Sequence, residues 1–172
     1  MICHKNKYFS VILKKTFYEI AFLHNHSAIV PIFKDMSFLI VKAKRKIVNK
    51  NLWEFPSGNP LNKKENLRNC ARREFFEETG IYINNLSRFK RLGRLLPMPA
   101  RSRNYVENFY VTIKEKEFLL RKKFDKEIFK IKKVNYLSLL NLIKKNQFYV
   151  STHVALAFML LLKKSTPVIK FR

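Results

Sequence analysis

The sequence has few cysteines, few glycines and no long apolar run. Because only Cys3 and Cys70 are available, a disulfide framework is not expected. The longest apolar run, Val154 to Leu162, is much shorter than the ~20 residues of a membrane-spanning helix. The first residues also lack the continuous apolar segment of a signal peptide. These absences predict a soluble, cytoplasmic protein without a membrane partner.

The chain also lacks Pro-, Gly- or Ser-rich linkers, heptad arrays and internal repeats. Its 172 residues suffice to bury one core, so we expect a single domain over residues 1–172. Residues 26–163 form the predicted core. Residues 1–25 contain two predicted strands, Tyr8 to Leu13 and Thr16 to Leu23, which form a hairpin through Lys14 and Lys15.

Acidic residues are scarce. The chain has 12 Asp plus Glu against 36 Lys plus Arg, and its formal net charge is +24. A basic surface attracts phosphates and binds nucleic acid without sequence preference. However, lysine is spread along the whole chain together with abundant Phe, Ile and Asn, so a compositional bias is the favoured explanation. Two basic runs, 42–46 and 88–103, are more local.

Three of the scarce acids lie within five residues, in the segment Arg73 to Ile81. On a helix, Glu74 and Glu78 are one turn apart and Glu77 lies beside them, so their oxygens can converge on hard divalent cations. A solvated acidic helix face is the simpler alternative. The repulsion between these like charges, in a chain so poor in acids, favours a metal site.

The periodicity around this cluster predicts a strand, a loop and a helix. The segment Trp53 to Gly58 has the pattern of a strand end entering a loop, and a helix is expected from Glu65 to a stop at Gly80. Further strands are predicted at 38–41 and 107–113, and further helices at 136–145 and 153–163. Strands mixed with helices in this way indicate a layered α/β fold.

From Glu65 onward the chain resembles the Nudix hydrolases. Their signature is Gly, five residues, Glu, seven residues, Arg-Glu, an apolar residue, any residue, Glu-Glu, any residue, Gly and an apolar residue. Seven residues separate Glu65 from Arg73, and Gly80 and Ile81 complete the pattern. Gly58 matches the first glycine only if the loop 59–64 contains one extra residue.

Within this family the chain resembles the ADP-ribose pyrophosphatase branch. The resemblance extends over residues 26 to 163. It includes Arg45, a Trp-Glu-Phe-Pro-Ser-Gly turn in which Ser57 replaces the usual alanine, prolines about where the branch has its diagnostic proline, and an acidic loop with Asp125 and Glu127.

This resemblance implies a Nudix-type α/β/α sandwich with a mixed sheet, an N-terminal piece that helps to form a homodimer, and Mg²⁺, with Mn²⁺ as an alternative. The reaction implied is hydrolysis of a nucleoside diphosphate linked to another moiety, such as ADP-ribose or a related nucleotide sugar. The implied metal ligands are Glu74, Glu77, Glu78, Glu127 and the Ser57 carbonyl. Glu127, Glu77 and Arg73 form the implied catalytic set, and Arg45, Glu54 and Arg101 the implied substrate contacts.

Two alternatives stay open. The arginines of 88–103 would also suit a more phosphorylated substrate, such as a nucleoside triphosphate or an RNA 5′ end. A protein of another class, a non-catalytic RNA- or nucleotide-binding module, would keep the fold and use the basic surface. The histidines show no ligand spacing and are interpreted as structural or surface residues; they are His4, His24, His26 and His153.

Overall fold

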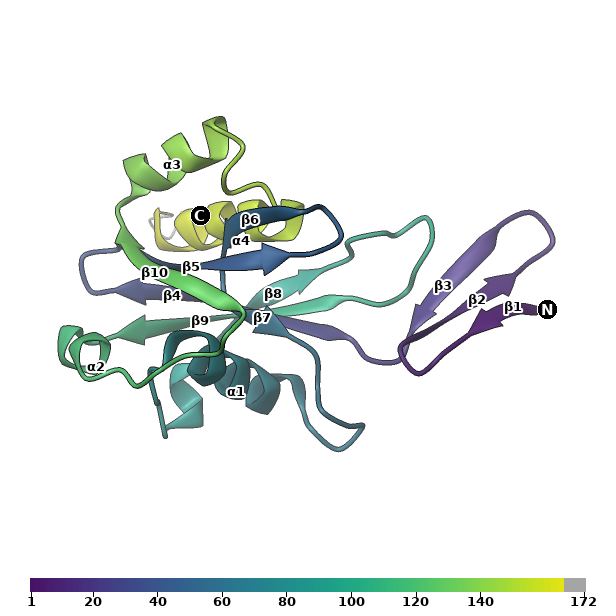
Figure 1. Cartoon of the computed structure of the whole chain (residues 1–172), viewed down its shortest axis with the longest axis horizontal. Coiled ribbons are helices and arrows are strands. Elements are labelled where there is room, and N and C mark those ends of the chain that lie inside the picture. Colours follow the sequence, from purple (N-terminus) through teal and green to yellow (C-terminus); the bar gives the residue numbers. More distant parts are fainter. Residues whose placement is uncertain (166–172) are drawn as a thin grey trace, which may run out of the picture.

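The computed structural model describes residues 1–165 and consists of two sheets and four α-helices (Figure 1). The strands are β1 (Ile2–Lys5), β2 (Phe9–Leu13), β3 (Tyr18–Phe22), β4 (His26–Phe33), β5 (Phe38–Arg45), β6 (Lys50–Glu54), β7 (Ser57–Gly58), β8 (Lys90–Leu95), β9 (Val106–Ile113) and β10 (Ile128–Val134). The helices are α1 (Leu67–Thr79), α2 (Glu115–Leu119), α3 (Tyr136–Lys144) and α4 (Ser151–Ser165), with a short 3₁₀ turn at Leu86–Arg88.

The central sheet has seven strands and is mixed. Its main path is β10-β5-β4-β9-β8, with β6 paired to β5 and β7 paired to β4. Strands β4 and β9 are parallel, and the other pairs are antiparallel. Helix α1 covers one face, and α3 and α4 cover the other (Figure 1). The predicted α/β/α sandwich with a mixed sheet is therefore confirmed.

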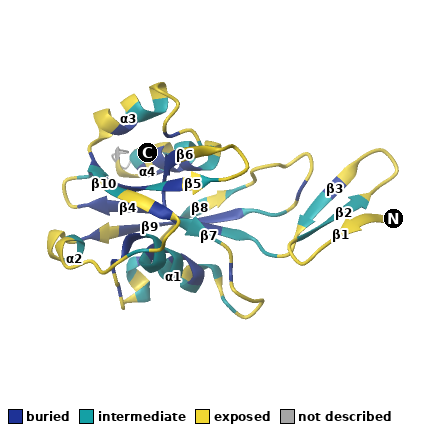
Figure 2. Cartoon of the chain, in the orientation of Figure 1, coloured by how far each residue is buried: buried dark blue, intermediate teal, exposed yellow. Residues whose placement is uncertain are grey.

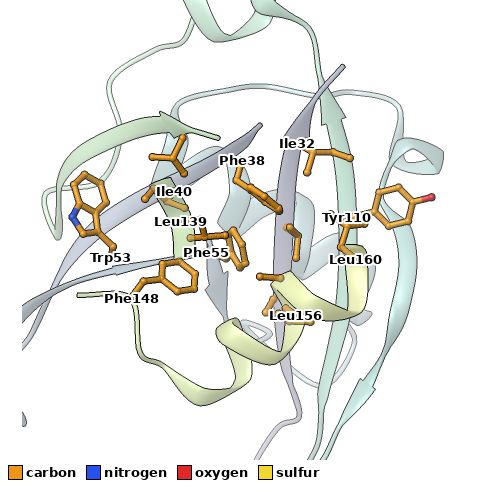
Figure 3. Packing of buried hydrophobic residues seen from close by; sticks show 14 of the residues in the cluster. Ile32, Phe38, Ile40, Trp53, Phe55, Tyr110, Leu139, Phe148, Leu156 and Leu160 are labelled. Atoms are coloured by element: carbon orange, nitrogen blue, oxygen red, sulfur yellow. The ribbon is translucent and has the colours of Figure 1, made fainter. Parts of the chain in front are cut away.

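Strand β4 lies at the centre of the core. All its residues after His26 are buried, and successive side chains enter opposite layers because a strand alternates its faces. Val30 and Ile32 pack in the cluster that includes Leu156 and Leu160 of α4, whereas Ile29 packs in the cluster beneath α1. Figure 3 shows the first of these clusters. A strand buried on both faces holds the residues at its ends in fixed positions.

The first three strands form a separate antiparallel sheet that projects from the body, and most of its residues are exposed or half-buried (Figure 2). The predicted hairpin is present as β2 and β3, whereas β1 was not predicted. Several contacts join this sheet to the segment before β9. The N–H of Ile20 donates to the carbonyl of Arg101 at 2.7 Å, and Arg103 pairs with Glu19 at 2.9 Å. The N–H of Phe22 donates to a side-chain oxygen at 3.0 Å.

Strand β8 was also not predicted, because its lysines and arginines hide the strand pattern. It lies at the edge of the sheet, where charged side chains are tolerated. Arg91 and Arg94 both pair with Glu107 of the neighbouring β9, which fixes the pairing of the two strands. Among residues 1–165, no helix combines the length and the apolar character that a membrane span requires.

Candidate active site

Both ends of α1 are fixed by local chemistry. The side chain of Asn66 accepts a hydrogen bond from the N–H of Asn69 at 2.9 Å and so caps the first turn. Gly80 ends the helix with a φ of 70°, a left-handed conformation that favours glycine. A Cβ on Gly80 would lie 2.1 Å from the carbonyl oxygen of Lys122. The glycine therefore also allows the segment 120–127 to pass close to the helix end.

This segment carries the predicted acidic loop to α1. The N–H of Lys122 donates to the carbonyl of Gly80, and the N–H of Asp125 donates to the carbonyl of Glu77, each at 2.8 Å. The carbonyl of Glu127 accepts from the N–H of Lys44 in β5 at 3.4 Å. These backbone contacts hold Glu127 between β5 and the acidic helix.

A cavity of about 170 Å³, which we call the acid cavity, forms where α1, β5, β7 and the loop before β10 meet. The structure thus brings together seven residues that the sequence singled out, of which five are acidic. The acid cavity is lined by Arg45, Ser57, Glu74, Glu77, Glu78, Asp125 and Glu127, together with Ala43 and Ile128.

Arg73 links the carboxylates of this region. Its Nη1 lies 2.8 Å from a carboxylate oxygen of Glu74 and 2.8 Å from one of Glu77, and its Nε lies 3.0 Å from Glu65. Its Nη2 donates to the carbonyl of Asn59 at 2.8 Å. Glu65 is held by Arg73 outside the acid cavity, as expected for a residue that fixes the loop to the helix. Within the described residues, no three His, Cys, Asp or Glu side chains are arranged as a group that could hold a metal ion.

Glu78 is the most deeply buried of the three helix glutamates. Its Oε2 accepts a hydrogen bond from the N–H of Ser57 at 3.1 Å. Burial raises the pKa of Glu78 well above its usual range, and the nearby Glu54 adds to this, while the Ser57 N–H opposes it. Burial also raises the pKa of Glu74, against the effect of Arg73. Both carboxylates would therefore be stabilised in their ionised form by a cation in the acid cavity.

Arg45 and Glu54 form an ion pair at the rim of the acid cavity. Arg45 donates to Glu54 through Nε at 3.2 Å and through Nη2, and the Glu54 side chain is only 1% exposed. Burial raises the pKa of Glu54, although Arg45 lowers it. Glu54 thus holds the guanidinium of Arg45, whose side chain remains 40% exposed and free to meet an anion.

Gly58 leaves the space that Glu74 occupies. A Cβ on Gly58 would lie only 2.0 Å from the carboxyl carbon of Glu74 and 2.1 Å from Oε1. This close approach places the Glu74 carboxylate beside β7, and it supports the assignment of Gly58 as the first glycine of the motif. The donor set around it is composed of hard oxygens, which fits Mg²⁺ or Mn²⁺.

The change Gly58→Ala is expected to lower kcat/KM by about 10- to 100-fold, a loss typical of a misplaced metal ligand or its support. Activity should fall because the new methyl group displaces the carboxylate of Glu74. Stability should change little because the atoms closest to the group belong to this flexible side chain and not to the backbone. The melting temperature should stay within a few degrees of the original. Ser57→Ala, in the same turn and with an unchanged backbone, is the matched control; equal activity of the two variants would contradict the prediction.

Arg101 is the predicted site residue that the structure places elsewhere. Its guanidinium carbon lies 4.7 Å from the centroid of the Tyr18 ring, and its side chain lines a cavity beside the N-terminal sheet together with Phe17 and Glu19. It does not line the acid cavity.

A second cavity of about 920 Å³ opens beside the acid cavity and shares Arg45, Ser57 and Glu127 with it. We call it the basic groove. It lies between the hairpin of β5 and β6 and the start of α4, and its lining includes Lys44, Lys46, Tyr149, Thr152 and His153.

A third cavity of about 390 Å³ continues from the basic groove, with which it shares His26, Asn59 and Thr152. We call it the aromatic pocket because its lining includes Phe22 of β3 and Tyr105 before β9. Pro97, one of the prolines about where the resembled branch has its diagnostic proline, also lines this pocket. The three cavities thus adjoin one another in the order acid cavity, basic groove, aromatic pocket.

His153 is a site candidate that the sequence interpretation missed. Its Nδ1 accepts a hydrogen bond from the N–H of Phe55 at 3.2 Å, and its side chain lines the basic groove although the residue is only 4% exposed. Burial lowers its pKa to about 3, with His26 and Arg45 adding to the effect. No motif in the sequence connects position 153 with position 55, so no local signal could have shown this contact.

Three comparisons place this geometry among known proteins. A model of the NUDIX domain matches residues 23–153. The chain is similar to a protein named 8-oxo-dGTP diphosphatase from Buchnera aphidicola subsp. Acyrthosiphon pisum (strain APS), with 31% identity over 125 residues, covering 72% of this chain and 86% of that protein. The crystal structure of an ADP compounds hydrolase matches 95% of this chain and 90% of its own, with a TM-score of 0.75 and 14% identity, which shows a shared fold.

Proposed function

Because the chain belongs to the Nudix family, we propose that it is a pyrophosphohydrolase that cleaves a nucleoside diphosphate linked to another moiety. ADP-ribose or a related nucleotide sugar is the proposed substrate, and the products are a nucleoside monophosphate and a sugar phosphate. The observation that carries the proposal is the acid cavity, where Glu127 joins Glu74, Glu77 and Glu78 across about fifty residues of sequence.

The residues that would hold Mg²⁺, or Mn²⁺ in its place, are Glu74, Glu77, Glu78 and Glu127 with the Ser57 carbonyl. When bound, such ions neutralise the diphosphate and lower the pKa of a water molecule. The hydrogen bonds of Arg73 orient Glu74 and Glu77, so Arg73 acts as a positioning residue.

The other side chains of the acid cavity bind the substrate and move a proton. Arg45 faces the phosphates while Glu54 fixes its guanidinium, so Glu54 acts through Arg45. Glu127 accepts the proton of the attacking water or completes the metal set. Asp125 lines the same cavity and is the second candidate for this role.

The change Glu127→Gln is expected to lower kcat by about 100-fold or more, which is the usual contribution of a general base. Glutamine keeps the size of the side chain and removes its capacity to take a proton. Glu115→Gln, on the exposed helix α2, is the control. A rate loss no larger than that of the control would remove Glu127 from the mechanism and leave Asp125 as the candidate.

The nucleoside is proposed to lie in the aromatic pocket, because the aromatic side chains of Phe22 and Tyr105 line it next to the basic groove. The shared fold with an ADP compounds hydrolase agrees with an adenosine diphosphate derivative. A second candidate, hydrolysis of a nucleoside triphosphate, is favoured by the 31% identity to a protein named 8-oxo-dGTP diphosphatase. The RNA 5′ end stays a substrate alternative.

A substrate panel with Mg²⁺ tests these candidates. It contains ADP-ribose, other nucleotide sugars, nucleoside triphosphates including 8-oxo-dGTP, dinucleoside polyphosphates and triphosphorylated RNA. The highest kcat/KM is expected for ADP-ribose or a nucleotide sugar, and EDTA should abolish turnover. Absence of turnover on the whole panel, together with salt-sensitive RNA binding, would instead identify a non-catalytic binding module.

We also propose that the chain is a single Nudix domain whose N-terminal sheet pairs with a second copy. A small sheet is stabilised by a hydrophobic face that is covered, yet Ile2, Leu13 and Tyr18 of this sheet are exposed. Light scattering should give twice the chain mass of 20.6 kDa. A single-chain mass at micromolar concentration would exclude the dimer.

A further inference from the structure

The amino end of α4 opens into the cavities beside the acid cavity. Val150, Thr152 and His153 line the basic groove, and Ser151 and Thr152 line the aromatic pocket. Within residues 1–165 the amides of Ser151 and Thr152 have no hydrogen-bond acceptor, whereas the next two amides both donate to the carbonyl of Val150. Free amides and the helix dipole at such an end favour an anion.

The buried His153 adds a second, independent donor at the same place. Because its Nδ1 accepts the Phe55 N–H, the proton of the neutral ring is on Nε2. The ring is neutral at working pH, since its pKa is lowered to about 3 by burial. No partner for Nε2 is found in the part of the chain that the structure describes, and the side chain lines the basic groove.

The opposite wall of the basic groove is the hairpin of β5 and β6. It contributes Lys44, Arg45 and Lys46 to the lining. Arg45 pairs with Glu54, whereas neither lysine forms a salt bridge with any carboxylate of the described residues. Two cationic side chains thus line the same groove as His153 and Thr152, whose amide is free among the described residues.

We propose that the basic groove contains an anion subsite, formed by the amino end of α4, Nε2–H of His153 and the lysines 44 and 46, for a phosphate group other than the two that flank the cleaved bond. The inference rests on the proposed function, because Arg45, Ser57 and Glu127 connect this groove with the acid cavity. The phosphate is either a third member of the polyphosphate chain or a substituent on the distal sugar.

Two pairs of substrates distinguish these sources. The first pair is diadenosine diphosphate and diadenosine triphosphate, and the second is ADP-ribose with and without a phosphate on the ribose distal to adenosine. In at least one pair, the additional phosphate is expected to raise kcat/KM about tenfold or more, mainly through KM, as one charge-assisted contact would. The pair that responds identifies the source.

Two variants test the subsite. Asn in His153→Asn keeps an acceptor at the position of Nδ1 for the Phe55 N–H and removes the Nε2 donor. Lys44→Gln/Lys46→Gln removes the opposite wall and leaves the core intact. In each variant, the ratio of kcat/KM between the two substrates of the responding pair is expected to fall toward unity. Lys116→Gln/Lys132→Gln, a surface double variant with the same loss of charge as Lys44→Gln/Lys46→Gln, should retain the original ratio.

A preference near unity in the original protein for both pairs, or one that survives both variants, would overturn the subsite. If no diphosphate is hydrolysed, the proposed function fails, and the subsite is then tested by calorimetric binding of inorganic tripolyphosphate in EDTA. The subsite predicts about tenfold weaker binding by His153→Asn and Lys44→Gln/Lys46→Gln than by the control variant. Equal affinities would refute it independently of catalysis.

Discussion

Replacing Glu78 with glutamine is expected to lower kcat/KM by more than about 100-fold, because even the residues that merely support metal ligands contribute 10- to 100-fold. Glutamine has the same size, and its side-chain oxygen can still accept the N–H of Ser57. The variant therefore loses the negative charge and little else. Steady-state kinetics with saturating Mg²⁺, with Glu115→Gln as the exposed control, measures the loss; unchanged turnover would refute the metal site.

The same substitution should separate activity from stability. The folded-state pKa of Glu78 is raised by burial, so its ionisation destabilises the metal-free fold once the pH rises through that pKa. In EDTA, the free energy of unfolding of the original protein should decrease as the pH rises through the pKa of Glu78. The glutamine variant should not show this decrease. A variant that is less stable than the original at high pH would contradict this account of the buried carboxylate.

Replacing Arg73 with alanine is expected to be the most destabilising single change near the site, by about 2 kcal/mol. Breaking a buried ion pair costs about 3–5 kcal/mol, and partial exposure reduces this value. The Arg73 side chain is 19% exposed, and Glu65 and Glu74 are each 15% exposed, so their charges would be left close together with little solvent. The melting temperature should fall by roughly 4–8 °C.

The neighbouring Arg72 provides a matched control, since among residues 1–165 it donates to the carbonyl of Asn84 at 3.1 Å and forms no salt bridge. Arg73→Lys keeps the charge but loses the planar group that reaches three carboxylates, so intermediate stability is expected. If Arg73→Ala and Arg72→Ala melt at the same temperature, Arg73 does not hold the carboxylates together. An effect on kcat with no change in melting would restrict its role to positioning.

The pH dependence of unfolding gives a further readout. Burial alone would raise the pKa of Glu65, but Arg73 and the N–H of Leu61 hold it below its usual range. Such a carboxylate stabilises the fold above its unfolded-state pKa, and this stabilisation is lost as the pH falls through the lowered pKa. Arg73→Ala should remove most of this acid sensitivity.

The local parts of the site could be predicted from sequence. A helix fixes the relative positions of Glu74, Glu77 and Glu78, and Gly80 ends it where the pattern requires. The extra residue before Glu65 is accommodated in the loop 59–66 without breaking the contact between Glu65 and Arg73. The local pattern contains this information because helical spacing and caps depend on neighbouring residues.

Other parts depended on contacts between distant segments. Glu54 was predicted to touch substrate, and only the tertiary structure shows that it is buried beside Arg45 and pairs with that arginine. Arg101 was predicted to contact substrate because its loop matches a loop of the resembled branch. In the structure, its guanidinium instead lies over the ring of Tyr18 in the N-terminal sheet. His153 looked structural, and only the packing of α4 on the central sheet, which brings Nδ1 to the N–H of Phe55, shows that one nitrogen is occupied and the other is available.

The sequence by itself therefore determined the family, the α/β layering and the acidic helix, because each follows from periodicity, spacing and caps within short stretches. The tertiary structure decided how that helix is completed. Backbone hydrogen bonds from Lys122 and Asp125 bring Glu127 to it, and the packing of α4 places His153 in the groove beside it. Bringing such distant segments together costs conformational entropy, and only the contacts of the whole fold offset this cost. No local pattern therefore encodes these pairings.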